Sequence, residues 1–103
     1  MGTKAERRAA RETVAAYHEA RLGELVEHVA EAVDRRRAGE LDAFEVDAVI
    51  HQYHRAARRL WTFCDAGGVQ AEITAHTIGR MADDGHAIDW WQQAEPRRAA
   101  GAS

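Results

Sequence analysis

The chain has 103 residues, which is enough for one domain and too few for two conventional ones. Apolar residues make up 46% and charged residues 30%, a composition that excludes a wholly disordered chain. The formal net charge is −3, so we expect no binding to nucleic acid through a strongly basic surface. Ala and Arg are abundant and the only proline is Pro96, so the sequence predicts an all-α protein.

Cysteine usage and hydropathy indicate the compartment. The single cysteine, Cys64, cannot form an intramolecular disulfide. No stretch has the apolar core of a signal peptide or the ~20 apolar residues of a membrane span. We therefore expect a cytoplasmic protein that does not interact with membranes. Cys64 ends a predicted helix, whose negative end raises a thiol pKa, so we interpret it as a small buried apolar residue and not as a nucleophile.

The first predicted helix covers residues 4–38, where Gly23 is the only glycine and proline is absent. Apolar residues in its second half recur at i, i+3, i+4 and i+7, which places them on one face. They are Leu22, Leu25, Val26, Val29, Ala32 and Val33. The opposite face, with Glu24, Glu27, His28 and Glu31, is typical of a solvated surface.

A helix end and a new helix start follow. Arginines 35–37 precede Gly39, a combination that favours the end of a helix. Asp42 and Glu45 then form a capping box in its Asp form, which predicts a second helix over residues 43–64. Its apolar stripe consists of Val46, Val49, Ile50, Tyr53, Ala57, Leu60, Trp61 and Cys64.

Because only about four residues separate these helices, they must pack antiparallel as a hairpin. We expect Val33 near Val46, Val29 near Ile50, and Leu22 near Ala57. The glycines at 67 and 68 predict the end of the second helix, before a third helix over residues 69–83. A short fourth helix is predicted over residues 86–94, and residues 1–3 and 97–103 are expected to be disordered.

The second helix is too short to cover the first. At 1.5 Å per residue it leaves the stretch around residues 7–17 without a hairpin partner. Either the third helix with the Trp90 and Trp91 turn, or a second copy of the chain, must cover this stretch. The predicted architecture is thus a single domain, a long antiparallel hairpin with a smaller C-terminal helical cap, and we expect it to form a homodimer.

The aromatic residues exceed what the two stripes need, which indicates contact surfaces. Phe44 and Phe63 are predicted to project away from the main face of the second helix, and the adjacent Trp90 and Trp91 cannot both point inward. The candidate partner-binding residues are Tyr17, Phe44, Trp61, Phe63, Trp90 and Trp91. The alternative is that the third helix and the tail fold over them.

A polar line along the second helix suggests a different class of function. Asp47, His51 and His54 stand at i, i+4 and i+7, with Arg58 four residues further on, and imidazole with carboxylate can hold a divalent metal. An acid-base site could also include His18, although a packed histidine is the plainer interpretation. The chain lacks the Glu-x-x-His pattern of helical di-metal sites, which favours a solvated or interfacial flank.

Motifs for other chemistry are missing. The sequence contains no phosphate-binding glycine loop, nucleophile elbow, Cys-x-x-Cys pair or His-Glu-x-x-His, so we expect no cofactor and no ordinary enzyme. Residues 70–79 partly match the start of a helix-turn-helix, but only Arg80 lies nearby and no basic recognition helix follows. The partial match keeps a small DNA-binding regulator or antitoxin as a third possibility, and the lack of a basic recognition helix disfavours it.

Three segments carry a resemblance: GELDAFEVD at 39–47, YHRA at 53–56 and LWTFC at 60–64. With these the chain resembles small uncharacterised helical proteins of high-GC bacteria such as actinobacteria, over about the middle half of its length. The resemblance implies a cytoplasmic bacterial origin and brings no activity or catalytic residue. The sequence as a whole favours a non-catalytic interaction or assembly module, with a helical protein or a second copy as its partner.

Overall fold

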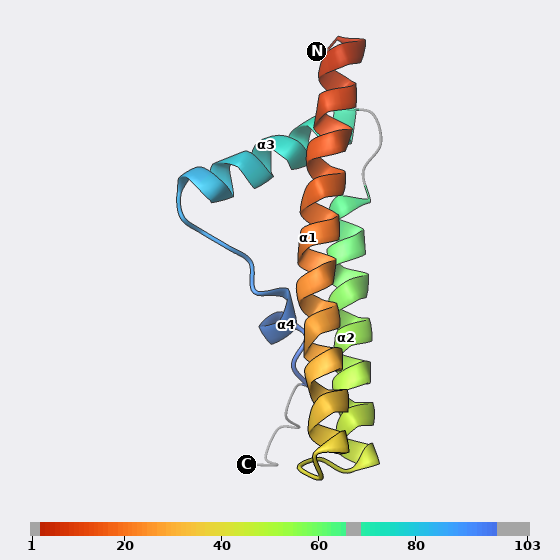
Figure 1. Ribbon diagram of the computed structural model, residues 1–103. Coiled ribbons are helices and arrows are strands. Elements are labelled where there is room, and N and C mark those ends of the chain that lie inside the picture. The colour runs from red at the N-terminus through yellow and green to blue at the C-terminus, as the bar shows by residue number, and fades with distance from the viewer. Residues whose placement is uncertain (1–2, 66–68, 97–103) are drawn as a thin grey trace.

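The computed structural model describes residues 3–65 and 69–96, which contain four helices and no strand (Figure 1). The long helix α1 (Lys4–Arg37) and the second helix α2 (Ala43–Cys64) run antiparallel. Helix α3 (Val69–Asp83) and the single turn α4 (Trp90–Gln93) lie on one side of this pair. The all-α fold, a long hairpin with a smaller helical cap, is therefore the one predicted.

Helix α1 begins at a capping box. The Thr3 hydroxyl accepts a hydrogen bond from the Glu6 backbone N–H at 3.1 Å, and the Glu6 carboxylate accepts one from the Thr3 N–H at 2.9 Å. The latter bond, the larger cause, and the Thr3 hydroxyl hold the Glu6 pKa below its ordinary value. The prediction that Thr3 belongs to a disordered tail was wrong, because its side chain satisfies a free N–H of the first turn. The other predicted tail residues, 1–2 and 97–103, lie outside the described residues, as does the glycine pair at 67 and 68.

The hairpin turn follows the predicted chemistry. Gly39 has a φ of +79°, which a residue without Cβ adopts at little cost, and its N–H donates to the Arg36 carbonyl at 2.9 Å. The Arg35 guanidinium reaches the Glu40 carboxylate at 3.1 Å. Asp42 caps α2, and its carboxylate accepts from the Glu45 N–H at 2.8 Å. These local bonds reverse the chain within a few residues.

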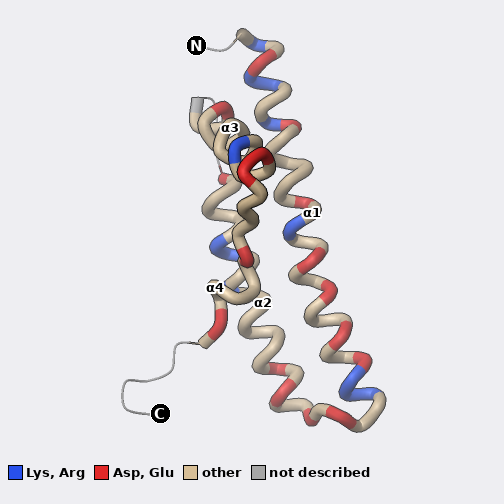
Figure 2. The backbone as a smooth tube through the Cα atoms, turned by 90° about the vertical axis from the view of Figure 1, so that its left-hand side faces the viewer, with Lys and Arg blue, Asp and Glu red and all other residues tan. Residues whose placement is uncertain are grey.

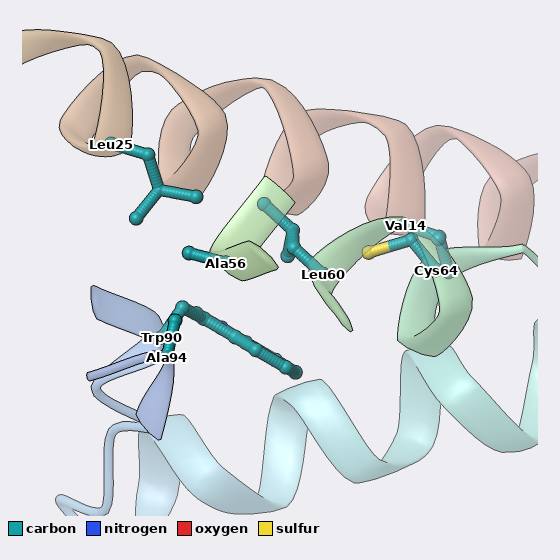
Figure 3. Packing of buried hydrophobic residues seen from close by; sticks show 7 residues of the cluster. All are labelled: Val14, Leu25, Ala56, Leu60, Cys64, Trp90 and Ala94. Carbon is teal, nitrogen blue, oxygen red and sulfur yellow. The ribbon is translucent and has the colours of Figure 1, made fainter. Parts of the chain in front are cut away.

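The core lies where α1, α2 and α4 meet (Figure 3). Ala56 and Leu60 are fully buried, and they pack in one cluster with residues of the other two helices. The remaining buried members of the cluster are Val14, Leu25, Cys64, Trp90 and Ala94. Figure 3 shows Leu25 at the level of Ala56 and Val14 at the level of Cys64.

The two predicted apolar stripes were only partly right. Val26, Ile50 and Trp61 were expected inside, but their exposed fractions are 45%, 44% and 56%. The fully buried Ala56 was not assigned to the stripe. The reason is that α4 packs beside α2, which shifts the buried arc of α2 away from Ile50 and Trp61 and toward Ala56.

Helix α3 covers the part of α1 that lacked a hairpin partner. Ala10 and Val14 of α1 are buried, as are Ala71 and Thr74 of α3, where the two helices pack. Helix α3 ends as predicted, with Gly85 at a φ of +71°. The fourth helix is shorter than the predicted 86–94, because helical structure starts only after Asp89, whose carboxylate caps Gln92 at 3.0 Å.

Candidate functional site

The side chains of α2 hold α4 in place through its last carbonyl groups. Gln52 donates to the Trp91 carbonyl and Arg55 to the Ala94 carbonyl, each at 2.9 Å. Arg59 donates to the Gln93 carbonyl at 2.6 Å. Cationic donors at the C-terminal end of a helix satisfy free carbonyls and complement the helix dipole. These three bonds fasten α4 to this side of α2, although the Arg55 Nη2 is buried there without a hydrogen-bond partner.

Aromatic side chains complete the docking of α4. Trp90 is buried, and its indole Nε1 donates to the Tyr17 hydroxyl at 3.0 Å. The Phe63 ring centroid lies 5.3 Å from that of Trp90 and 5.8 Å from that of Tyr17. The prediction that Phe63 projects away from the core was thus wrong. Trp91 stacks on His28 with centroids 4.0 Å apart, so the helix face predicted to be solvated carries part of this contact.

Of the six aromatic residues predicted to bind a partner, two remain largely exposed. Phe44 is 85% exposed at the start of α2, and Trp61 is 56% exposed. Tyr17, Phe63, Trp90 and Trp91 make the internal contacts described above. The turn α4, and not the third helix or the tail named in the alternative, supplies these contacts, and the tail at 97–103 lies outside the described residues.

Val26, Ile50 and Trp61 lie on the side of the hairpin opposite to α3 and α4. A helix turns about 100° per residue, so Ile50 and Trp61 point about 120° to 180° away from the α2 side chains that bond α4. Val26 stands at a similar angle from His28 on α1, which contacts Trp91. No described element covers this side, which we call the open face (Figure 1).

Two adjacent cavities lie on the other side, between α1 and the segment that joins α3 to α4. Their volumes are about 270 and 250 Å³, and both are lined by Arg21, Ala87 and Ile88. One Arg21 nitrogen meets the Glu24 carboxylate at 2.9 Å, and the guanidinium carbon lies 5.7 Å from the Tyr17 ring centroid. The Arg21 cation is thus already paired, which weakens its attraction for a further anion.

The three predicted metal ligands do not form a cluster, although two of them are in contact. The His51 Nδ1 lies 2.9 Å from the Asp47 carbonyl oxygen and 3.4 Å from its carboxylate, while His54 is exposed. Within residues 3–65 and 69–96, no three His, Cys, Asp or Glu side chains cluster as metal ligands would. The predicted residues all belong to one exposed helix face, and His18 is half-buried on α1. The line is therefore the polar flank of the open face.

Cys64 is buried in the core cluster and has a free thiol. Burial raises the pKa of this thiol, because the charged thiolate loses hydration there. The nucleophilic form is disfavoured at neutral pH, which agrees with the interpretation of Cys64 as a packing residue.

Sequence reasoning missed the polar clamp on α4. Gln52, Arg55 and Arg59 are spaced i, i+3 and i+7, which places them along one side of a helix. That spacing was the available signal, but the carbonyl groups they bind belong to the backbone and leave no trace in the sequence.

Comparison with protein-family models found no match, and comparisons with curated proteins and with solved structures found none either.

None of the helices in the described part of the chain has the length and hydropathy that crossing a bilayer requires. Basic and acidic residues are interspersed along α1 (Figure 2).

Proposed function

We propose that the protein is a non-catalytic interaction module that self-associates through the open face. The observation that carries this proposal is that Val26, Ile50 and Trp61, three apolar side chains that are about half exposed, lie on the open face of the hairpin. Clustered exposed apolar residues are typical of interaction surfaces, and tryptophan is enriched among residues that dominate binding energy.

The dimensions of the open face suit a dimer. Helix α2 has 22 residues, so it is about 33 Å long, and two adjacent helices are roughly 20 Å wide. A face of this size approaches the ~800 Å² per partner of a standard protein interface. A second hairpin placed on it would complete a four-helix arrangement, in which each copy covers the apolar residues of the other.

A second copy is the partner we favour, because a hairpin whose own cap protects only one side gains most from another hairpin of the same kind. The resemblance to proteins of high-GC bacteria supports a bacterial, cytoplasmic setting for this assembly. A different helical protein on the same face is the competing outcome.

Sedimentation velocity over a range of concentrations tests the proposal. We expect the unmodified protein to form dimers at tens of micromolar, and Trp61→Glu or Val26→Glu to shift it to monomer, because a carboxylate cannot be buried in an apolar interface without a partner.

Ile73→Glu is the matched control. Ile73 is 53% exposed but lies on α3, on the opposite side of the hairpin, so this variant should still dimerise. Circular dichroism should give the same helix content for all three variants. A monodisperse monomer of the unmodified protein at these concentrations would overturn the proposal, and loss of dimer in Ile73→Glu would place the interface elsewhere.

A further inference from the structure

We propose a specific register for this dimer: two α2 helices pack antiparallel, and Asp47 of each copy pairs with Arg58 of the other. This inference rests on the proposed function and adds the orientation and the electrostatic partner. It depends on the charged flank of the open face, which no contact within the chain fully uses.

The flank carries an acidic and a basic residue that point in similar directions around the helix axis. Asp47 and Arg58 are both exposed, and they point in nearly the same direction, about 20° apart around α2. They lie about 40° to 80° from Ile50 and Trp61, on the edge of the open face. Arg58 forms no ion pair within residues 3–65 and 69–96, and Asp47 contacts only the exposed His51 at 3.4 Å.

The spacing then selects the register. Asp47 and Arg58 are eleven residues apart, which is three helical turns and about 16.5 Å along the axis. A two-fold axis midway between them, at the level of Gln52 and Tyr53, brings each Asp47 to the level of Arg58 in the second copy. This two-fold axis lies in the plane of the interface and is perpendicular to the helices. The charged flank of one α2 therefore faces the charged flank of the other α2. Both ion pairs therefore form at once, flanking the apolar stripe as charges flank a coiled-coil seam.

The position of Val26 on α1 is compatible with the same two-fold axis. Leu25 lies at the level of Ala56, and Val14 at the level of Cys64, so Val26 stands within about one turn of the level of Tyr53. In the proposed dimer the two copies of Val26 consequently meet near the two-fold axis. The apolar contact at the centre and the charged contacts at the edge thus require the same arrangement.

Charge reversal tests the register. Asp47→Arg leaves two like-charged contacts in its homodimer, and Arg58→Asp does the same with the opposite sign. We expect the dissociation constant of each homodimer to rise about tenfold or more at low ionic strength. An equimolar mixture of the two variants should dimerise as well as the unmodified protein, because in the heterodimer each position 47 meets a position 58 of opposite charge. The double variant should also recover.

Glu27→Arg provides the control, because it makes the same charge change at an exposed position of α1 outside the open face. It should leave the dissociation constant unchanged. Added salt should reduce the differences among the variants, because exposed charges are screened.

The register is wrong if either charge variant dimerises as tightly as the unmodified protein, or if the mixture binds no more tightly than the variants alone. If that happens while Trp61→Glu still abolishes the dimer, the open face stays the interface and only its orientation changes. A monomeric unmodified protein would overturn both proposals.

Discussion

The two sides of the same hairpin show how differently one pair of helices can be used. The covered side carries Leu60 and Trp90, both buried, and the open face carries Ile50 and Trp61, both about half exposed. All four are large apolar side chains, so hydrophobicity alone does not decide which become buried. The position of α4 decides it, because that turn brings an indole and three hydrogen-bonded carbonyls to one side only.

The bonds on the two sides also differ in how far apart their partners lie in the sequence. On the covered side, the hydrogen bonds between α4 and the hairpin join residues 34 to 73 positions apart. On the exposed flank of α2, His51 contacts Asp47 only four positions away, and Thr62 bonds the Arg58 carbonyl at the same spacing. The long-range hydrogen bonds that stabilise the tertiary structure therefore lie on the covered side, and the exposed flank of α2 carries local bonds.

The largest expected effect contrasts two tryptophans. Trp90→Ala removes a buried ring and the hydrogen bond to Tyr17, so we expect the free energy of unfolding to fall by about 3–5 kcal/mol. Trp61→Ala should change it by less than about 0.5 kcal/mol in the monomer. Urea denaturation followed by circular dichroism, below the concentration of self-association, measures both. Equal losses would mean that the two sides contribute alike.

An intermediate effect is expected at the clamp on α4. Arg55→Ala removes the half-buried donor to the Ala94 carbonyl and should lower the free energy of unfolding by about 2 kcal/mol. Arg8→Ala is the control, because Arg8 is exposed on α1 and its loss should have almost no effect. If the two variants lost equal stability in the same denaturation experiment, charge and not docking would be responsible.

The smallest effect concerns Cys64 on the covered side. Its thiol pKa is raised by burial, so the folded protein keeps this proton at a pH where the unfolded chain has lost it. Stability should therefore decrease as the pH rises through the ordinary thiol pKa of about 8.5. Denaturation across this range should show the decrease, and Cys64→Ala should remove it. An unchanged pH profile in that variant would mean that another group is responsible.

The hairpin could be predicted because its determinants are local. Gly39 ends α1, and Asp42 with Glu45 starts α2, so each signal and its effect lie within a few residues. The bounds of α2 and α3 follow from similar signals. Helix α4 was predicted too long because the expected range ignored the capping side chain of Asp89, which fixes the first turn.

The buried side of α2 could not be predicted in the same way. Helical periodicity places Trp61 and Leu60 on neighbouring parts of one arc, but it does not tell which edge of that arc will be covered. The covering residue, Trp90, comes 30 positions after Leu60, and its hydrogen-bond partner Tyr17 lies 73 positions before it. Among the candidate partner residues, only Phe44 and Trp61 thus retain the exposure that such a role needs.

The long range of the contacts made by α4 also sets an order of events during folding. The turn at Gly39 joins neighbouring segments quickly, whereas Trp90 must find Tyr17 by closing a loop that includes most of the hairpin. An early hairpin therefore has both sides bare and is most prone to aggregate at that stage. Docking of Trp90 ends this exposure on one side of the hairpin, while the open face keeps its exposed apolar side chains in the folded molecule.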